Sequence, residues 1–199
     1  YQAIERLNLV IANIPNSSVV GAEDDNADLM WHYYGEALTL RALMYMELCR
    51  NFGDVPFRTE PASDETFYVE RTDRDVIYET LLDDLLEAQE YLTYVGEGVH
   101  NTVERVTKGF AKGLRARIAM YRAGYSIRPD GVTRQGSNPE VYYAIAKKEA
   151  EELIADGVHQ LNPDFRNHFI MQCRHQVDNN YRESLFEVGL GINRSGEIG

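Results

Sequence analysis

The sequence predicts an all-α fold, built from tetratricopeptide-like helical hairpins with long loops and a short C-terminal strand. Apolar residues recur at three- and four-residue steps over five segments, the spacing that places them on one face of a helix. Proline or glycine follows four of these segments, at positions where helices commonly end. Small residues occupy packing positions of the fourth segment, as they do in stacked helical repeats.

The first two predicted helices span residues 2–14 and 27–52. The first stops at Pro15, because proline lacks the N–H group that a helix needs. Its apolar stripe consists of Ile4, Leu7, Val10, Ile11 and Ile14. The second is the longest and ends at Gly53, a residue type favoured just past a helix C-terminus.

The third and fourth predicted helices span residues 72–92 and 107–123. Thr72 or Asp73 can cap the first turn of the third helix. Its inner stripe consists of Ile77, Leu81, Leu85, Ala88 and Leu92. The fourth helix is rich in glycine and alanine, so neighbouring helices can approach it closely. We therefore expect it to be buried on more than one side.

The fifth predicted helix spans residues 138–157, with proline in its first turn. Its inner stripe consists of Tyr142, Ile145, Ala146, Ala150, Leu153 and Ile154. The helical portion thus covers about residues 1–157, and an irregular segment with a strand at residues 184–191 covers about residues 158–199. No later helix is expected to cover the fifth one, which predicts that the chain is a truncated part of a single domain.

The charge of the 199-residue chain excludes several partners. Its formal net charge is −12, whereas nucleic-acid binding and docking on an anionic membrane need a basic surface. A neutral ligand such as a sugar, or a cationic partner patch, fits better. No apolar run approaches the roughly 18 residues of a membrane span. Because the first residue is Tyr1, we expect any export signal or lipid-anchor cysteine to lie outside this sequence.

No pattern of ionisable residues predicts an enzyme, a metal site or a cofactor. Asp24, Asn26 and Asp28 have the spacing of the first ligands of a calcium-binding loop. That loop needs glycine and glutamate at its sixth and twelfth positions, where this sequence has Leu29 and Gly35. Nucleophile elbows, HExxH motifs and phosphate-binding glycine loops do not occur.

Other polar clusters have structural interpretations. One group matches no common metal-site spacing and consists of His168, Cys173 and His175. His32 and Glu36 lie one helical turn apart and are expected to form an exposed hydrogen bond. Three carboxylates of the third helix are expected to be solvated on its outer face: Asp83, Asp84 and Glu87. Cys49 is expected to be a buried free thiol.

Aromatic residues at the start of the second helix provide the candidate site. Trp31, Tyr33 and Tyr34 cluster there, and flat aromatic faces stack on the apolar C–H faces of sugar rings. Core packing is the alternative, because consecutive helical positions point in different directions. Further tyrosines fall on inner stripes and are expected in the core: Tyr45, Tyr78, Tyr121 and Tyr142.

Five blocks of this sequence, in order, resemble the SusD/RagB family. The first contains Leu40-Arg41-Ala42 and ends in Phe52-Gly53-Asp54-Val55-Pro56. The others begin at Arg74-Asp75-Val76, Arg105-Val106-Thr107, Tyr143 and Glu183-Ser184-Leu185-Phe186-Glu187. Arg41 lies within an apolar helix face, so we expect it to pair with a buried carboxylate or with carbonyl groups at a helix end.

The resemblance implies a Bacteroidetes-type lipoprotein without catalytic activity, on the extracellular face of the outer membrane. Such a protein would capture glycans or oligosaccharides, or in some branches peptides, and pass them to a TonB-dependent SusC-like transporter. Family members bind their ligands in a shallow aromatic site built from loops, much of it outside the resembling blocks. The alternative is a helical-repeat scaffold that binds a peptide or protein partner.

Overall fold

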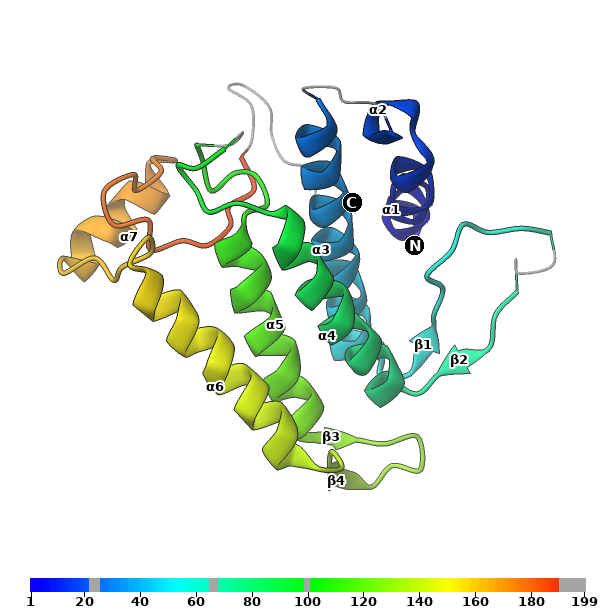
Figure 1. Ribbon diagram of the computed structural model, residues 1–199. Coiled ribbons are helices and arrows are strands. Elements are labelled where there is room, and N and C mark those ends of the chain that lie inside the picture. Colours follow the sequence, from blue (N-terminus) through cyan, green and yellow to red (C-terminus); the bar gives the residue numbers. More distant parts are fainter. Residues whose placement is uncertain (22–25, 65–67, 99–100, 190–199) are drawn as a thin grey trace.

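The computed structural model describes residues 1–21, 26–64, 68–98 and 101–189 and is mainly helical (Figure 1). Its helices are α1 (Gln2–Asn13), α2 (Ser18–Gly21), α3 (Ala27–Phe52), α4 (Arg74–Tyr91), α5 (Lys108–Ala123), α6 (Pro139–Asp156) and α7 (Phe165–Cys173). A 3-10 turn, η1 (Ile14–Asn16), follows α1. The five helices predicted from the sequence correspond to α1, α3, α4, α5 and α6.

The long helices pack in chain order and alternate in direction (Figure 1). Helix α1 packs on α3, α3 on α4, α4 on α5, and α5 on α6. This arrangement confirms the predicted all-α fold of helical hairpins. Every member of the predicted α4 stripe is buried: Ile77, Leu81, Leu85, Ala88 and Leu92.

The predicted core tyrosines divide into three groups. Tyr45 and Tyr78 are buried, as expected. Tyr142 is half-buried, and its hydroxyl donates to Glu79 Oε1 at 2.6 Å. Tyr121 leaves 36% of its surface exposed, so its assignment to the core was wrong. It lies in the last turn of α5, where its ring stacks on Tyr78 with centroids 6.4 Å apart while part of the side chain faces solvent.

The inner face of α6 differs from the predicted stripe. Ala150 is exposed, and Ile154 leaves 76% of its surface exposed. Glu149 is buried against α5 instead, where Arg115 binds its carboxylate and Lys112 Nζ lies 3.2 Å from it. Two cations from the neighbouring helix thus make it possible to bury a charge in this position.

Two short antiparallel sheets project from the helices (Figure 1). Strand β1 (Val55–Pro56) pairs with β2 (Arg71–Thr72), and β3 (Tyr125–Ile127) forms a hairpin with β4 (Thr133–Gln135). The β3–β4 hairpin lies in a segment that the sequence predicted to be a loop.

The C-terminal strand predicted at residues 184–191 is wrong for residues 184–189, and residues 190–191 lie outside the described residues. Glu187 N–H donates to Val103 O at 2.9 Å, but Val103 belongs to a turn and offers no strand for a ladder. Helix α7 was also missed. Its apolar residues Phe165 and Phe169 are exposed and give no inward stripe.

The segment after α6 returns to pack on α5. The ring of Phe186 stacks on Phe110, with ring centroids 4.5 Å apart. Leu185 lies so close to Gly113 that a Cβ atom there would overlap its Cδ1 atom. Helix α5 therefore contacts α4, α6 and this segment, which confirms that it is buried on more than one side.

The end of α3 is fixed to the start of α4 by Gly53 and its neighbours. Gly53 has φ +76°, and a Cβ atom there would overlap the guanidinium group of Arg74. Asp54 Oδ1 accepts from Arg74 Nε at 3.0 Å and from its backbone N–H at 3.3 Å. The Phe-Gly-Asp sequence thus fixes how the chain leaves the longest helix.

Replacing Gly53 with alanine is expected to lower the free energy of unfolding by about 1–3 kcal/mol, because a side chain here is strained and displaces Arg74. Denaturant unfolding measures the change. Gly131→Ala is the matched control, since Gly131 has φ +78° but nothing within 4 Å of the added Cβ. Equal losses in the two variants would mean that the Arg74 contact contributes nothing.

Candidate functional site

The predicted site residues Trp31 and Tyr34 meet a third ring, Tyr91, which the sequence did not suggest. The indole of Trp31 stacks on Tyr91, with centroids 4.8 Å apart and planes 12° apart. Tyr34 lies edge-on to both, with centroids 5.5 Å from Trp31 and 5.4 Å from Tyr91. We call these three half-buried residues the aromatic cluster. Tyr91 joins it because α3 and α4 are antiparallel, which brings the last turn of α4 beside the first turns of α3.

The hydroxyl group of Tyr34 gives the aromatic cluster a polar edge. It donates to Glu87 Oε1 at 2.9 Å. Burial, and then this bond to Glu87, raise the pKa of Tyr34, so the hydroxyl stays protonated at neutral pH. Glu87 is exposed, as the sequence predicted, and it also accepts this hydrogen bond.

Tyr33 points away from the aromatic cluster. It lines an apolar groove of about 540 Å³ between α1 and α3, together with Leu9, Val10 and Met30. The guanidinium group of Arg105 lies 5.8 Å from the centroid of the Tyr33 ring. The structure thus brings Trp31 and Tyr34 together, but not Tyr33.

His32 and Glu36 are buried, contrary to the exposed hydrogen bond that the sequence suggested. His32 Nε2 lies 3.7 Å from Glu36 Oε1. The same carboxylate accepts two hydrogen bonds from Arg105, at 3.1 and 2.6 Å. His32, Glu36 and Arg105 therefore hold the segment before α5 against α3, and we assign them a structural role.

Arg41 does pair with a carboxylate, that of Asp84, whose side chain is 12% exposed. Its guanidinium group donates to Asp84 Oδ2 at 2.7 and 3.1 Å, and also to Asn8 Oδ1 and Thr59 O. Burial raises the pKa of Asp84, and the attraction of Arg41 opposes this only in part. Asp84 was expected on the solvated face of its helix and instead joins α1, α3 and α4. We assign it a structural role.

The histidines near α7 show no metal-binding arrangement. His168 is buried, with Nδ1 3.7 Å from Asp178 and 3.8 Å from Glu183, whereas Cys173 and His175 are exposed. Within the described part of the chain, no group of three or more histidine, cysteine or acidic residues is placed to hold a metal ion. The same part contains no helix that is both long and apolar enough to cross a membrane.

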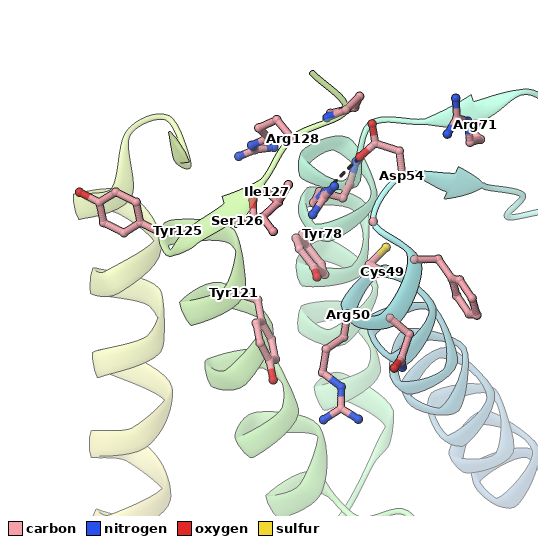
Figure 2. Close-up of a pocket in the computed structure, with 15 residues that line it drawn as sticks. Cys49, Arg50, Asp54, Arg71, Tyr78, Tyr121, Tyr125, Ser126, Ile127 and Arg128 are labelled. Carbon is pink, nitrogen blue, oxygen red and sulfur yellow. Dashed lines mark hydrogen bonds and ion pairs between the residues drawn. The ribbon is translucent and has the colours of Figure 1, made fainter. Parts of the chain in front are cut away.

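A cavity of about 520 Å³ lies between the end of α3, the start of α4 and the β3–β4 hairpin (Figure 2). Among the described residues, its lining carries the guanidinium groups of Arg50, Arg71, Arg74 and Arg128 and the carboxylate of Asp54. The rings of Tyr78 and Tyr121 stack in its wall, with centroids 6.4 Å apart. Sequence reasoning missed this cavity because its residues come from separate segments.

Two properties of the cavity limit its chemistry. Cys49 lines it, but burial raises the pKa of the thiol to about 12, so the sulfur is protonated and unreactive at neutral pH. The cavity is also remote from the aromatic cluster. Trp31 and Phe52 belong to the same helix, and a rise of about 1.5 Å per residue separates them by roughly 30 Å.

Comparison with known proteins finds SusD-like proteins both by sequence and by structure. Residues 1–120 match the model of a SusD-like family described as starch-binding and associating with the outer membrane. The chain is 33% identical over 96 residues to SusD-like protein P25 of Formosa agariphila, a match that covers 48% of this chain and 17% of that protein.

Solved structures show the same similarity. A SusD homologue from Bacteroides thetaiotaomicron aligns with 98% of this chain and 35% of its own, at a TM-score of 0.79 and 28% identity. A laminarin-binding SusD-like protein aligns with 62% of this chain and 25% of its own, at a TM-score of 0.53 and 28% identity. The chain thus spans about a third or less of the length of these relatives.

Proposed function

Because the chain belongs to the SusD-like family, whose description is starch-binding and associating with the outer membrane, we propose that it is part of a surface protein that captures glycans. The whole protein would present an oligosaccharide to a TonB-dependent, SusC-like transporter from the extracellular face of the outer membrane. A similar protein of known structure is laminarin-binding. The proposed role is binding without catalysis.

The aromatic cluster is the observation in this chain that favours glycan capture. Trp31, Tyr34 and Tyr91 hold one another in place by stacked and edge-on contacts. Rings that are ordered before binding lose little side-chain freedom when a ligand arrives. A sugar ring can stack on such a surface while hydroxyl and carboxylate groups at its edge bind the sugar hydroxyls. Tyr34 and Glu87 supply those polar groups.

Replacing Trp31 with alanine is expected to weaken glycan binding by the full-length protein about two- to tenfold, from the loss of an aromatic contact of about 0.5–1.5 kcal/mol. Calorimetry with laminarin and soluble starch measures the change. Phe165→Ala is the matched control, because Phe165 is an exposed aromatic residue on α7. An unchanged affinity would contradict a binding role for Trp31, and a collapse of the melting temperature would assign it to the core.

The apolar groove beside Tyr33 favours a second candidate function, the binding of a peptide or protein segment. Leu9 and Val10 of α1 are exposed along it, and Met30 of α3 forms the opposite side. A helical or extended segment could place apolar side chains there. If the full-length protein bound no polysaccharide but bound a peptide from a transporter loop, this function would replace glycan capture.

A further inference from the structure

We propose that the cavity between α3, α4 and the β3–β4 hairpin is a second saccharide site, which binds sugars that carry a carboxylate group, such as hexuronates. This inference rests on the proposed function and narrows its ligand class. Nothing in the sequence resemblance points to these residues as a site. The argument depends on the hydrogen-bond donors, the rigidity and the aromatic wall of the cavity.

Among the described residues that line the cavity, four guanidinium groups face one carboxylate group, that of Asp54. A guanidinium group has five N–H donors, and the ion pairs in this lining use only some of them. Arg74 binds Asp54 through its backbone N–H and Nε, and Arg128 binds Asp75 through Nη1 at 2.9 Å. Their remaining N–H groups are left for an acceptor in the cavity. A carboxylate is the acceptor that matches a guanidinium group best.

Arg71 provides the positive charge that these ion pairs do not neutralise. Arg50, Arg74 and Arg128 lie beside carboxylates: Glu47, Asp54, and Asp73 with Asp75. Arg71 is exposed at the cavity and forms no ion pair with any residue in 1–21, 26–64, 68–98 or 101–189. One unneutralised guanidinium group suits a ligand with a single carboxylate per sugar.

The walls of the cavity are held in place before any ligand binds. Gly53 and Asp54 fix Arg74, as described above. The side chain of Arg128 is only 11% exposed while it pairs with Asp75, and Tyr78 is buried in the wall. Groups that are already positioned lose little entropy on binding, and a volume of about 520 Å³ lies within the usual range for small-molecule sites.

The aromatic wall favours a sugar ring over a simple anion. Tyr78 and Tyr121 stack in this wall, and Figure 2 shows them with Arg50, as side chains from α4, α5 and α3. Tyr121 is the ring that was expected in the core but is partly exposed. The Tyr121 ring stacks on Tyr78, and the guanidinium group of Arg117 lies 6.0 Å from its centroid. The part of the ring that stays exposed offers an apolar contact for a pyranose ring, beside guanidinium donors for its carboxylate.

The test measures binding of trigalacturonate and of neutral maltotriose to the full-length protein by calorimetry. We expect trigalacturonate to bind, with an affinity that falls as salt concentration rises. Arg71→Gln should weaken trigalacturonate binding at least about tenfold, because it removes a hydrogen bond to a charged group, and should leave maltotriose binding unchanged. Arg166→Gln is the matched control, because Arg166 is exposed on α7 and has no ion pair among the residues described.

The outcomes separate this inference from the proposed function. Binding of neutral glycans together with no binding of trigalacturonate, or equal effects of Arg71→Gln and Arg166→Gln, would overturn the inference and leave glycan capture standing. No binding of any glycan would overturn both. Triglutamate is the third probe. If it bound as tightly as trigalacturonate and lost affinity in Arg71→Gln, the cavity would be a site for acidic peptides and the saccharide assignment would be wrong.

Discussion

Replacing Glu149 with glutamine is expected to lower the free energy of unfolding by about 3–5 kcal/mol, the usual effect of removing one partner from a buried ion pair. The side chain of Glu149 is only 2% exposed and accepts hydrogen bonds from Arg115 and Lys112 on α5 and from Gln89 on α4. Glutamine can still accept a hydrogen bond from Arg115, as the carbonyl group of Leu82 does, but the charge that balances this buried guanidinium group is lost. Denaturant unfolding of the full-length protein measures the loss.

Two further variants show whether the unpaired cation causes the loss. Glu151→Gln removes an exposed carboxylate from the same helix, whose ion-pair partner among the described residues is Lys147 at 3.6 Å, and should change the stability by less than about 0.5 kcal/mol. The double variant Arg115→Met/Glu149→Leu removes the Arg115–Glu149 pair, while Lys112 keeps Glu152 as its partner, and should recover most of the stability. If the double variant were as unstable as Glu149→Gln, lost packing rather than an unpaired charge would explain the effect.

The spacing of apolar residues was sufficient to predict the helices whose buried faces are apolar. The α4 stripe is regular and entirely buried, so its period alone placed it correctly. The pattern failed for α6, because Glu149 lies where an apolar residue is expected and its partner Arg115 is 34 residues away. Helix α7 was missed for a similar reason, since it buries His168 while its phenylalanines are exposed.

The candidate site could be predicted only where its residues are close in the sequence. Trp31 and Tyr34 are one turn apart, and local density identified them. Tyr91 depends on the register of α4 against α3, which a single sequence does not encode in any short motif. The cavity could not be predicted from the sequence. Its lining comes from three separate segments, residues 49–54, 71–78 and 121–129, and only the folded chain brings their hydrogen-bond donors together.

The second large effect concerns Arg41, which lies in the first of the blocks that resemble the SusD/RagB family. Its guanidinium group joins Asp84 of α4 to Asn8 of α1 and to the carbonyl group of Thr59. Burial already raises the pKa of Asp84 in the native protein, so the ionised carboxylate depends on Arg41 for its compensation. Removal of Arg41 leaves a buried carboxylate without a counter-charge, which is far more costly than the loss of a surface pair.

Arg41→Met is therefore expected to lower the free energy of unfolding by about 3–5 kcal/mol at pH 7, and by less at pH 4. Without Arg41, the folded-state pKa of Asp84 rises further above its unfolded value of about 3.9. A carboxyl group whose pKa is raised in the folded state stabilises the fold below the unfolded pKa, and this contribution is lost as the pH rises through the folded pKa. The difference in the free energy of unfolding between the unmodified protein and Arg41→Met should therefore grow as the pH rises from about 4 toward neutrality. Unfolding curves at both pH values measure it, with Arg41→Met/Asp84→Asn as the control in which that growth disappears. A deficit that is equal at both pH values would show that Asp84 is not the group that Arg41 compensates.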